Sequence, residues 1–186
     1  MSDTETLAGK LLIAEPTLHA AAFHRTVTLM LEHTDDGALG VVLDRPSDTS
    51  VTEVLPQWTD RVAAPGVVFS GGPVSPEVAI CLGERDDVGE ADGWQVAVGH
   101  LGTLDVSRSP DELPADVGRV RIFSGYAGWS AGQLEGELEA GAWYVVERLD
   151  DDCFSTDPNE LWSRVLRRQP GRLAAVGLYP ADPSVN

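Results

Sequence analysis

The run from Ser124 to Leu138 constrains the fold of this chain more than any other segment. It predicts the end of a strand, then a glycine turn, then a helix. Ser130 is the expected N-cap, because Gln133 three residues later completes a capping box in which each side chain satisfies a free backbone N–H. Gly141 marks the expected end of the helix, where a left-handed residue is usually needed. A strand followed closely by a capped helix is therefore predicted.

The apolar spacing in that helix predicts which face is buried. Leu134 and Leu138 share one face, and Trp129 is expected to pack on Leu134 as a hydrophobic staple. The acidic residues of the helix are expected to point away from this face: Glu135, Glu137 and Glu139.

Short strands dominate the rest of the chain. Apolar runs and two-residue alternation predict strands at 10–14, 26–32, 39–43, 67–69, 78–82, 94–98, 119–123 and 143–146. Asp36-Gly37 predicts a tight hairpin between the second and third of these. Because the helices do not alternate regularly with the strands, the expected fold class is α+β.

Two further helices are predicted from their end signals. One begins at the N-cap Ser50 and stops before Pro56. The other has Asp157 as N-cap and Pro158 at its first position, and it stops at Pro170-Gly171. Its buried stripe is expected to be Leu161, Trp162, Val165 and Leu166.

Length and charge limit the organisation and the partners. The 186 residues fit one domain spanning 1–186, with 1–8 as an expected flexible N-terminus. The net charge of -17, from 13 Lys and Arg against 30 Asp and Glu, disfavours direct binding to nucleic acid, whose phosphates are held by cations.

Cys81 and Cys153 form no Cys-x-x-Cys pattern and are expected to be free thiols, which favours the reducing cytoplasm. Neither a secretory signal nor a membrane span is predicted.

No residue pattern predicts a catalytic or metal site. Ser70 and Ser124 end strands but lie outside the Gly-x-Ser-x-Gly elbow that exposes a hydrolase serine. No His-Glu-x-x-His pair occurs, so neither a metal nor a cofactor is expected at His19, His24, His33 or His100. The acidic cluster around His33 coincides with the hairpin turn and is expected to be solvated. A basic cluster is typical of a helix C-terminus, where cations stabilise the helix dipole: Arg164, Arg167, Arg168 and Arg172.

A binding pocket is predicted where two Phe-Ser-Gly segments, at 69–71 and 123–125, approach each other. Glycines let a backbone approach a ligand closely, and Ser70–Val74 is compatible with a nest of N–H groups for an anion. This run lacks the Lys and the Ser or Thr of a phosphate loop, so a plain tight turn is the alternative. The expected lining of the pocket is Ser70, Gly71, Gly72, Tyr126 and Gln133.

Together these motifs resemble the bacterial YqgE/AlgH family over nearly the whole chain. The resemblance is carried by Gly9–Ala14 with Pro16, Glu32-His33, Gly40–Pro46, Gly71–Val74, Gly125–Trp129, Gly132–Glu135 with Glu137, Trp143, Trp162 and Pro183–Asn186. Asp44 departs from the family pattern, which more often has Asn there, and residues 107–118 are short and proline-rich where relatives often have a helix. The resemblance implies a cytosolic domain of coiled, mixed and largely antiparallel sheet with a few packed helices, and no established active site.

Three functions remain open at this point. The first is a non-enzymatic binding or regulatory protein with a protein or small-molecule partner, which the lack of a catalytic constellation favours. The second is an enzyme of unknown class with a pocket at the glycine-rich turns. The third is transcriptional regulation, since some family members carry that label. The acidic charge and the lack of a basic recognition helix disfavour direct DNA contact.

Overall fold

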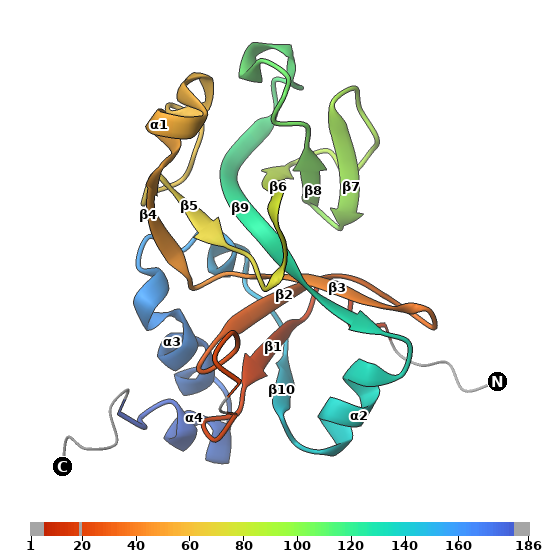
Figure 1. The fold of residues 1–186 in the computed structure, drawn as a ribbon, viewed down its shortest axis with the longest axis vertical. Coiled ribbons are helices and arrows are strands. Elements are labelled where there is room, and N and C mark those ends of the chain that lie inside the picture. The colour runs from red at the N-terminus through yellow and green to blue at the C-terminus, as the bar shows by residue number, and fades with distance from the viewer. Residues whose placement is uncertain (1–5, 19, 181–186) are drawn as a thin grey trace.

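The computed structural model describes residues 6–18 and 20–180 (Figure 1). His19, the terminal motif Pro183–Asn186 and most of the expected flexible N-terminus lie outside the described residues. Within the described part, ten strands form one curled sheet, and four α-helices pack around it. No helix in this part of the chain is long and apolar enough to cross a membrane.

The elements follow one another as short strands with few helices between them. The strands are β1 (Leu11–Ala14), β2 (Val27–Thr34), β3 (Gly37–Val42), β4 (Pro46–Ser50), β5 (Val67–Ser70), β6 (Val74–Arg85), β7 (Trp94–Val98), β8 (Leu101–Leu104), β9 (Val117–Ser130) and β10 (Trp143–Val146). The α-helices are α1 (Val51–Val54), α2 (Gln133–Glu139), α3 (Leu161–Arg167) and α4 (Arg172–Val176).

Strand β9 joins the two halves of the sheet (Figure 1). It pairs antiparallel with β6 and parallel with β5 along its first part, and antiparallel with β3 from Ala127 to Ser130. Strands β5 and β6 lie on opposite edges of β9, because both pair with it at Phe123 and Ser124. Strand β3 leads on to β2, β1 and β10, strand β5 leads to β4, and strand β6 leads to β8 and β7. Since the remaining named strand pairs are antiparallel, the expected α+β class with a mixed, largely antiparallel sheet is confirmed.

The local strand predictions hold where apolar alternation is clear. The β2–β3 hairpin forms one residue earlier than predicted, since Thr34 pairs with Gly37 and the turn is Asp35-Asp36. The strands expected at 94–98 and 143–146 have the same bounds in the structure. Two strands were not predicted, because β4 is polar without alternation and β8 has Gly102 and Thr103 between its two leucines, which breaks the apolar run.

The run from Ser124 to Leu138 differs from its prediction in two respects. Instead of turning, the chain continues as β9 to Ser130, and Gly125 takes a φ of 71° within the strand opposite an irregularity of β6. The N-cap of α2 is Gly132, not Ser130, because Ser130 still pairs with β3. Part of the predicted capping box remains, since the Gln133 side chain accepts the Ser130 N–H at 3.1 Å. The helix is consequently shorter than expected.

The other helices begin and end near their predicted signals. Ser50 caps α1 with its hydroxyl. Asp157 makes no capping hydrogen bond, because Pro158–Glu160 form a 3-10 turn before α3 begins. Helix α3 buries the four predicted residues and ends before Pro170-Gly171, after which the unpredicted α4 follows.

Buried apolar side chains form three clusters. The largest lies between α3 and the sheet, a second packs against α1, and the third lies under α2. Trp129 and Leu134 share the third cluster, as the staple predicted. The indole N–H groups of Trp129 and Trp143 both donate to Glu137, at 2.9 and 2.8 Å. Glu137 therefore points toward these tryptophans and not away from them as expected.

Candidate functional site

The two Phe-Ser-Gly segments lie side by side, because β5 and β9 pair in parallel with Ser70 opposite Ser124. Both serines line a mainly apolar hollow of about 500 Å³, here called the serine pocket. Glu77 is the titratable side chain of its lining, and neither serine hydroxyl bonds to it among the described contacts. The Ser124 hydroxyl donates instead to the Pro76 carbonyl. The serine pocket therefore contains hydroxyls without an activating base.

The two glycines after Ser70 allow close packing of backbone on backbone. The N–H groups of Ser70 and Gly71 donate to backbone carbonyls at 2.8 and 2.9 Å. A Cβ on Gly71 would lie 2.3 Å from the Gly125 carbonyl oxygen. One on Gly72 would lie 2.2 Å from the Tyr126 backbone. These two N–H groups already have acceptors in the sheet, so they are not available to a bound anion.

Tyr126 and Gln133 lie outside the lining of the serine pocket. Tyr126 is half-buried against the largest apolar cluster. Gln133 is exposed at the start of α2, where its side chain bonds Ser130 and Glu137. Of the five residues predicted to line one pocket, the structure places Ser70 in a hollow and Gln133 at a separate helix start.

The histidine and cysteine candidates have structural surroundings. In the cluster at the hairpin turn, Glu32, Thr34, Asp35 and Asp36 are exposed as expected. The His33 side chain is instead buried, with its Nδ1 3.1 Å from the Leu7 backbone nitrogen and its Nε2 2.9 Å from Glu135. Cys81 and Cys153 are free and buried, and burial raises the pKa of both thiols, which disfavours reactive thiolates. No cluster of three or more potential metal ligands occurs among the described residues.

A second hollow, of about 510 Å³, lies between α3, the end of α4 and the loops next to β2 and β3. We call it the arginine pocket, because three guanidinium groups line it: Arg25 before β2, Arg45 after β3 and Arg167 on α3. These are three of the 13 basic residues of a strongly acidic chain. Its lining also includes His24, Asp44, Glu160, Trp162, Ser163, Leu178 and Tyr179.

Local backbone features place these arginines. Arg25 has a φ of 53°, which is uncommon for a residue with a side chain, and its guanidinium lies 3.9 Å from the centre of a Trp162 ring. Arg45 donates to a backbone carbonyl of the loop before β2. Gly177 lets the end of α4 approach α3, since a Cβ there would lie 2.8 Å from the Arg167 Cγ. The pocket is thus built by elements from both ends of the chain.

None of the three arginines forms an ion pair with a described residue. Arg25 donates to the Pro180 carbonyl at 3.3 Å, and within the described chain Arg167 has no side-chain hydrogen bond. Desolvation lowers the pKa of Arg25, and the nearby Glu160 opposes that effect. Among the described residues, the arginine pocket therefore presents positive charge without direct carboxylate contact.

Asp44 is the buried carboxyl of the arginine pocket, with 5% of the residue exposed. Its Oδ1 accepts the Val27 N–H at 3.1 Å, so the side chain extends the β2–β3 ladder past its last backbone pair. Burial raises the pKa of Asp44 to about 7, although the Val27 N–H and Arg45 act to lower it. The carboxyl is therefore partly protonated at neutral pH.

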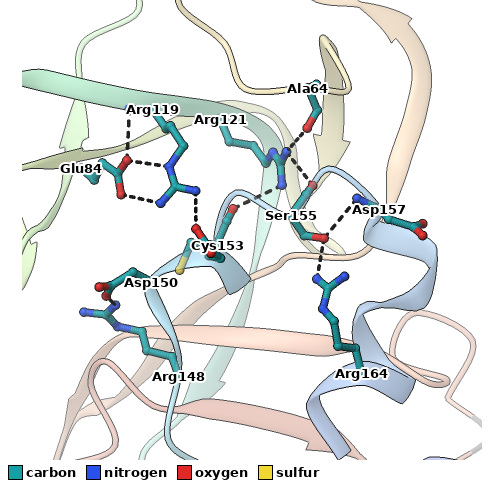
Figure 2. Close-up of polar contacts among 11 residues, drawn as sticks. Ala64, Glu84, Arg119, Arg121, Arg148, Asp150, Cys153, Ser155, Asp157 and Arg164 are labelled. Carbon is teal, nitrogen blue, oxygen red and sulfur yellow. Dashed lines mark hydrogen bonds and ion pairs between the residues drawn. The ribbon is translucent and has the colours of Figure 1, made fainter. Parts of the chain in front are cut away.

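The arginines in Figure 2 have partners instead. Arg119 bonds Glu84 and Asp151, each at 2.6 Å. Arg121 is 1% exposed, and its guanidinium lies 4.3 Å from the centre of the Phe69 ring. Its terminal nitrogens donate to the backbone carbonyls of Ala64, Cys153 and Ser155. These arginines connect β9 to loops that are distant in the sequence.

The basic cluster predicted on the last helix divides between two surroundings. Arg164 donates to the Ser155 hydroxyl at 2.6 Å (Figure 2), and Arg168 donates to the buried Asp152 at 2.7 Å. Arg167 instead lines the arginine pocket. The shared helix-dipole role expected from the sequence therefore does not describe these residues fully.

Comparison with known proteins gives consistent matches. An AlgH-like family profile matches residues 11–174. The chain is 46% identical to the UPF0301 protein of Streptomyces avermitilis, over 100% of this chain and 98% of that protein. The crystal structure of protein DIP2367 from Corynebacterium diphtheriae has a TM-score of 0.88 and 30% identity, covering 96% of this chain and 95% of that one. The solution structure of the AlgH protein from Pseudomonas aeruginosa has a TM-score of 0.68 and 30% identity, covering 98% of both chains.

Proposed function

The chain belongs to the AlgH-like family, and from this premise we propose that it is a non-enzymatic cytoplasmic protein with a binding or regulatory role, whose small-molecule partner occupies the arginine pocket. The carrying observation is that pocket, since a hollow of about 510 Å³ with a few convergent polar groups is typical of small-molecule sites. Ser163 and His24 both line it, and the absence of a hydrogen bond between these two side chains among the described contacts supports a binding role over nucleophilic catalysis.

A ligand screen by NMR on the full ¹⁵N-labelled chain tests this proposal. Binding compounds should shift backbone amides around the arginine pocket and remain chemically unchanged after long incubation. Ser163→Trp, which fills the pocket from α3, should abolish these shifts, whereas the matched control Ser70→Trp in the serine pocket should retain them. Conversion of a bound compound would contradict the non-enzymatic role, and the lack of any pocket-directed binder would contradict the site.

A second candidate is an enzyme acting at the serine pocket, favoured by the adjacent Ser70 and Ser124 in an apolar hollow. It predicts turnover of an apolar substrate that Ser70→Ala abolishes. Direct DNA regulation is the weakest of the three proposals, because the net charge of -17 repels a phosphate backbone. It predicts DNA binding at low salt that weakens steeply as salt is added.

A further inference from the structure

We infer that the ligand of the arginine pocket is a small organic anion whose carboxylate or phosphate group is bound by the three guanidinium groups. Its apolar part lies against Leu178 and Tyr179 at the edge of the same hollow. This inference rests on the proposed function and names the class of ligand that the proposal leaves open.

The first argument is the charge left unpaired in the arginine pocket. The chain has 30 acidic residues, and elsewhere arginines such as Arg119 and Arg168 contact carboxylates directly. Arg25, Arg45 and Arg167 contact none among the described residues, although they line one hollow. A guanidinium presents paired N–H donors that match the geometry of a carboxylate or a phosphate. A bound anion supplies the partner that the described residues do not.

The acidic groups facing the pocket do not cancel this charge. Glu160 is exposed and lies outside ion-pair distance of the three arginines. Asp44 is buried with one oxygen bonded to the Val27 N–H, and in its protonated form it can donate to an anion. Three cations thus face one exposed carboxylate and one partly neutral carboxyl.

The second argument is the apolar edge of the pocket. Leu178 and Tyr179 are 70% and 59% exposed, although both are large and apolar for most of their surface. They line the hollow together with Trp162, so its lining has an apolar part as well as the arginines. Covering such surface favours binding, at about 25 cal/mol per Å². An organic anion therefore fits the pocket better than an inorganic one.

NMR titration of the full chain with defined probes tests the inference. Phenyl phosphate and benzoate should shift amides around the arginine pocket, and inorganic phosphate should bind more weakly than phenyl phosphate. Benzyl alcohol and benzylammonium should bind at least about tenfold more weakly than the two organic anions, because neither carries the negative charge that strengthens hydrogen bonds from guanidinium groups. The relative affinities of phenyl phosphate and benzoate distinguish the two anionic groups.

A matched pair of variants on α3 tests the role of the arginines. Arg167→Gln should weaken phenyl phosphate binding about tenfold, and Arg167→Lys should restore part of it. Arg164→Gln, one turn earlier, removes the same charge outside the pocket and should change affinity less than about twofold. Both residues are exposed, so a thermal unfolding profile should confirm that the variants fold.

The outcomes separate this inference from the proposed function. If benzyl alcohol binds the pocket as tightly as phenyl phosphate, or Arg167→Gln and Arg164→Gln weaken binding equally, the anionic class is overturned while a pocket for small molecules remains. If none of the probes binds but the wider screen finds neutral ligands there, the inference alone fails. If neither finds a ligand in the pocket, both fail.

Discussion

Arg167 ends α3 and Arg168 is its C-cap, and these neighbours represent two uses of the same side chain. Arg168 donates to the buried Asp152, and like Arg119 and Arg121 it connects segments of the fold. Arg167 lines the arginine pocket without a side-chain hydrogen bond among the described residues. An arginine with its donors satisfied stabilises the fold, whereas one without a partner is available to a ligand. Substituting an arginine that has partners should therefore lower stability, whereas substituting one without a partner should weaken ligand binding and leave stability nearly unchanged.

The largest effect is expected for Arg121→Ala. The change removes the donor of three backbone carbonyls, two of them in buried contacts, and opens a cavity under Phe69. The free energy of unfolding, measured by urea denaturation, should fall by about 4 kcal/mol. A loss below about 1 kcal/mol would show that Arg121 is not a structural arginine and would break the comparison.

Asp44→Asn tests whether the buried carboxyl of the arginine pocket is neutral. Because its pKa is raised from 3.8 to about 7, the folded state keeps a proton that the unfolded state releases. The stability this proton contributes is present below about pH 4 and is lost as pH rises through about 7, by at most about 4 kcal/mol.

The Asn side chain retains an acceptor for the Val27 N–H, so the variant should lack this loss. We expect Asp44→Asn to be more stable than the parent by about 3 kcal/mol at about pH 8, with the difference decreasing toward about pH 4. Urea denaturation across this pH range measures it. A variant that is less stable than the parent at about pH 8 would indicate an ionised Asp44 paired with Arg45. The arginine pocket would then resemble the surroundings of Arg119 and Arg168, whose guanidinium groups contact carboxylates.

Arg168→Gln should have a smaller but clear effect on stability. It removes the charged partner of Asp152, which is 2% exposed, while the Leu149 N–H still donates to that carboxylate at 2.7 Å. The expected loss is about 2 kcal/mol by chemical denaturation. Rescue by the double change Arg168→Gln with Asp152→Asn would attribute the loss to the unpaired carboxylate.

Arg167→Gln should have the smallest effect on stability. Its side chain is exposed and makes no hydrogen bond or ion pair within the described chain, so the free energy of unfolding should change by less than about 0.5 kcal/mol. Urea denaturation of Arg167→Gln and Arg168→Gln under the same conditions compares their free energies of unfolding directly. Equal losses in the two variants would remove the distinction between the two kinds of arginine.

The sequence predicts the fold class and the local elements well where signals lie within a few residues. The β2–β3 hairpin, β7, β10 and the buried stripe of α3 were all predicted from such signals. The prediction of a glycine turn at Gly125 was wrong, because a glycine with positive φ fits an irregular strand as readily as a turn. Only pairing of β9 with β3 and β6 decides between them, and pairing between distant strands is not a local property.

The arginine pocket was missed for the same reason. Arg25, Arg45 and Arg167 are far apart in the sequence, and no short motif contains two of them. A signal was available in Asp44-Arg45, where a carboxyl and a guanidinium follow the apolar end of a predicted strand. The adjacency of Ser70 and Ser124 was easier to anticipate, because both follow a phenylalanine at a strand end.

The shared position of β9 has a consequence for how the protein is made. Strands β3, β5 and β6 all leave the ribosome before β9 is synthesised, and each needs β9 to complete its hydrogen bonding. Until then the nascent chain exposes three strand edges that can pair with other molecules. Once the chain is made past Ser130, β9 can pair with all three strands. A chain that is released before β9 should therefore aggregate under conditions in which the complete chain folds.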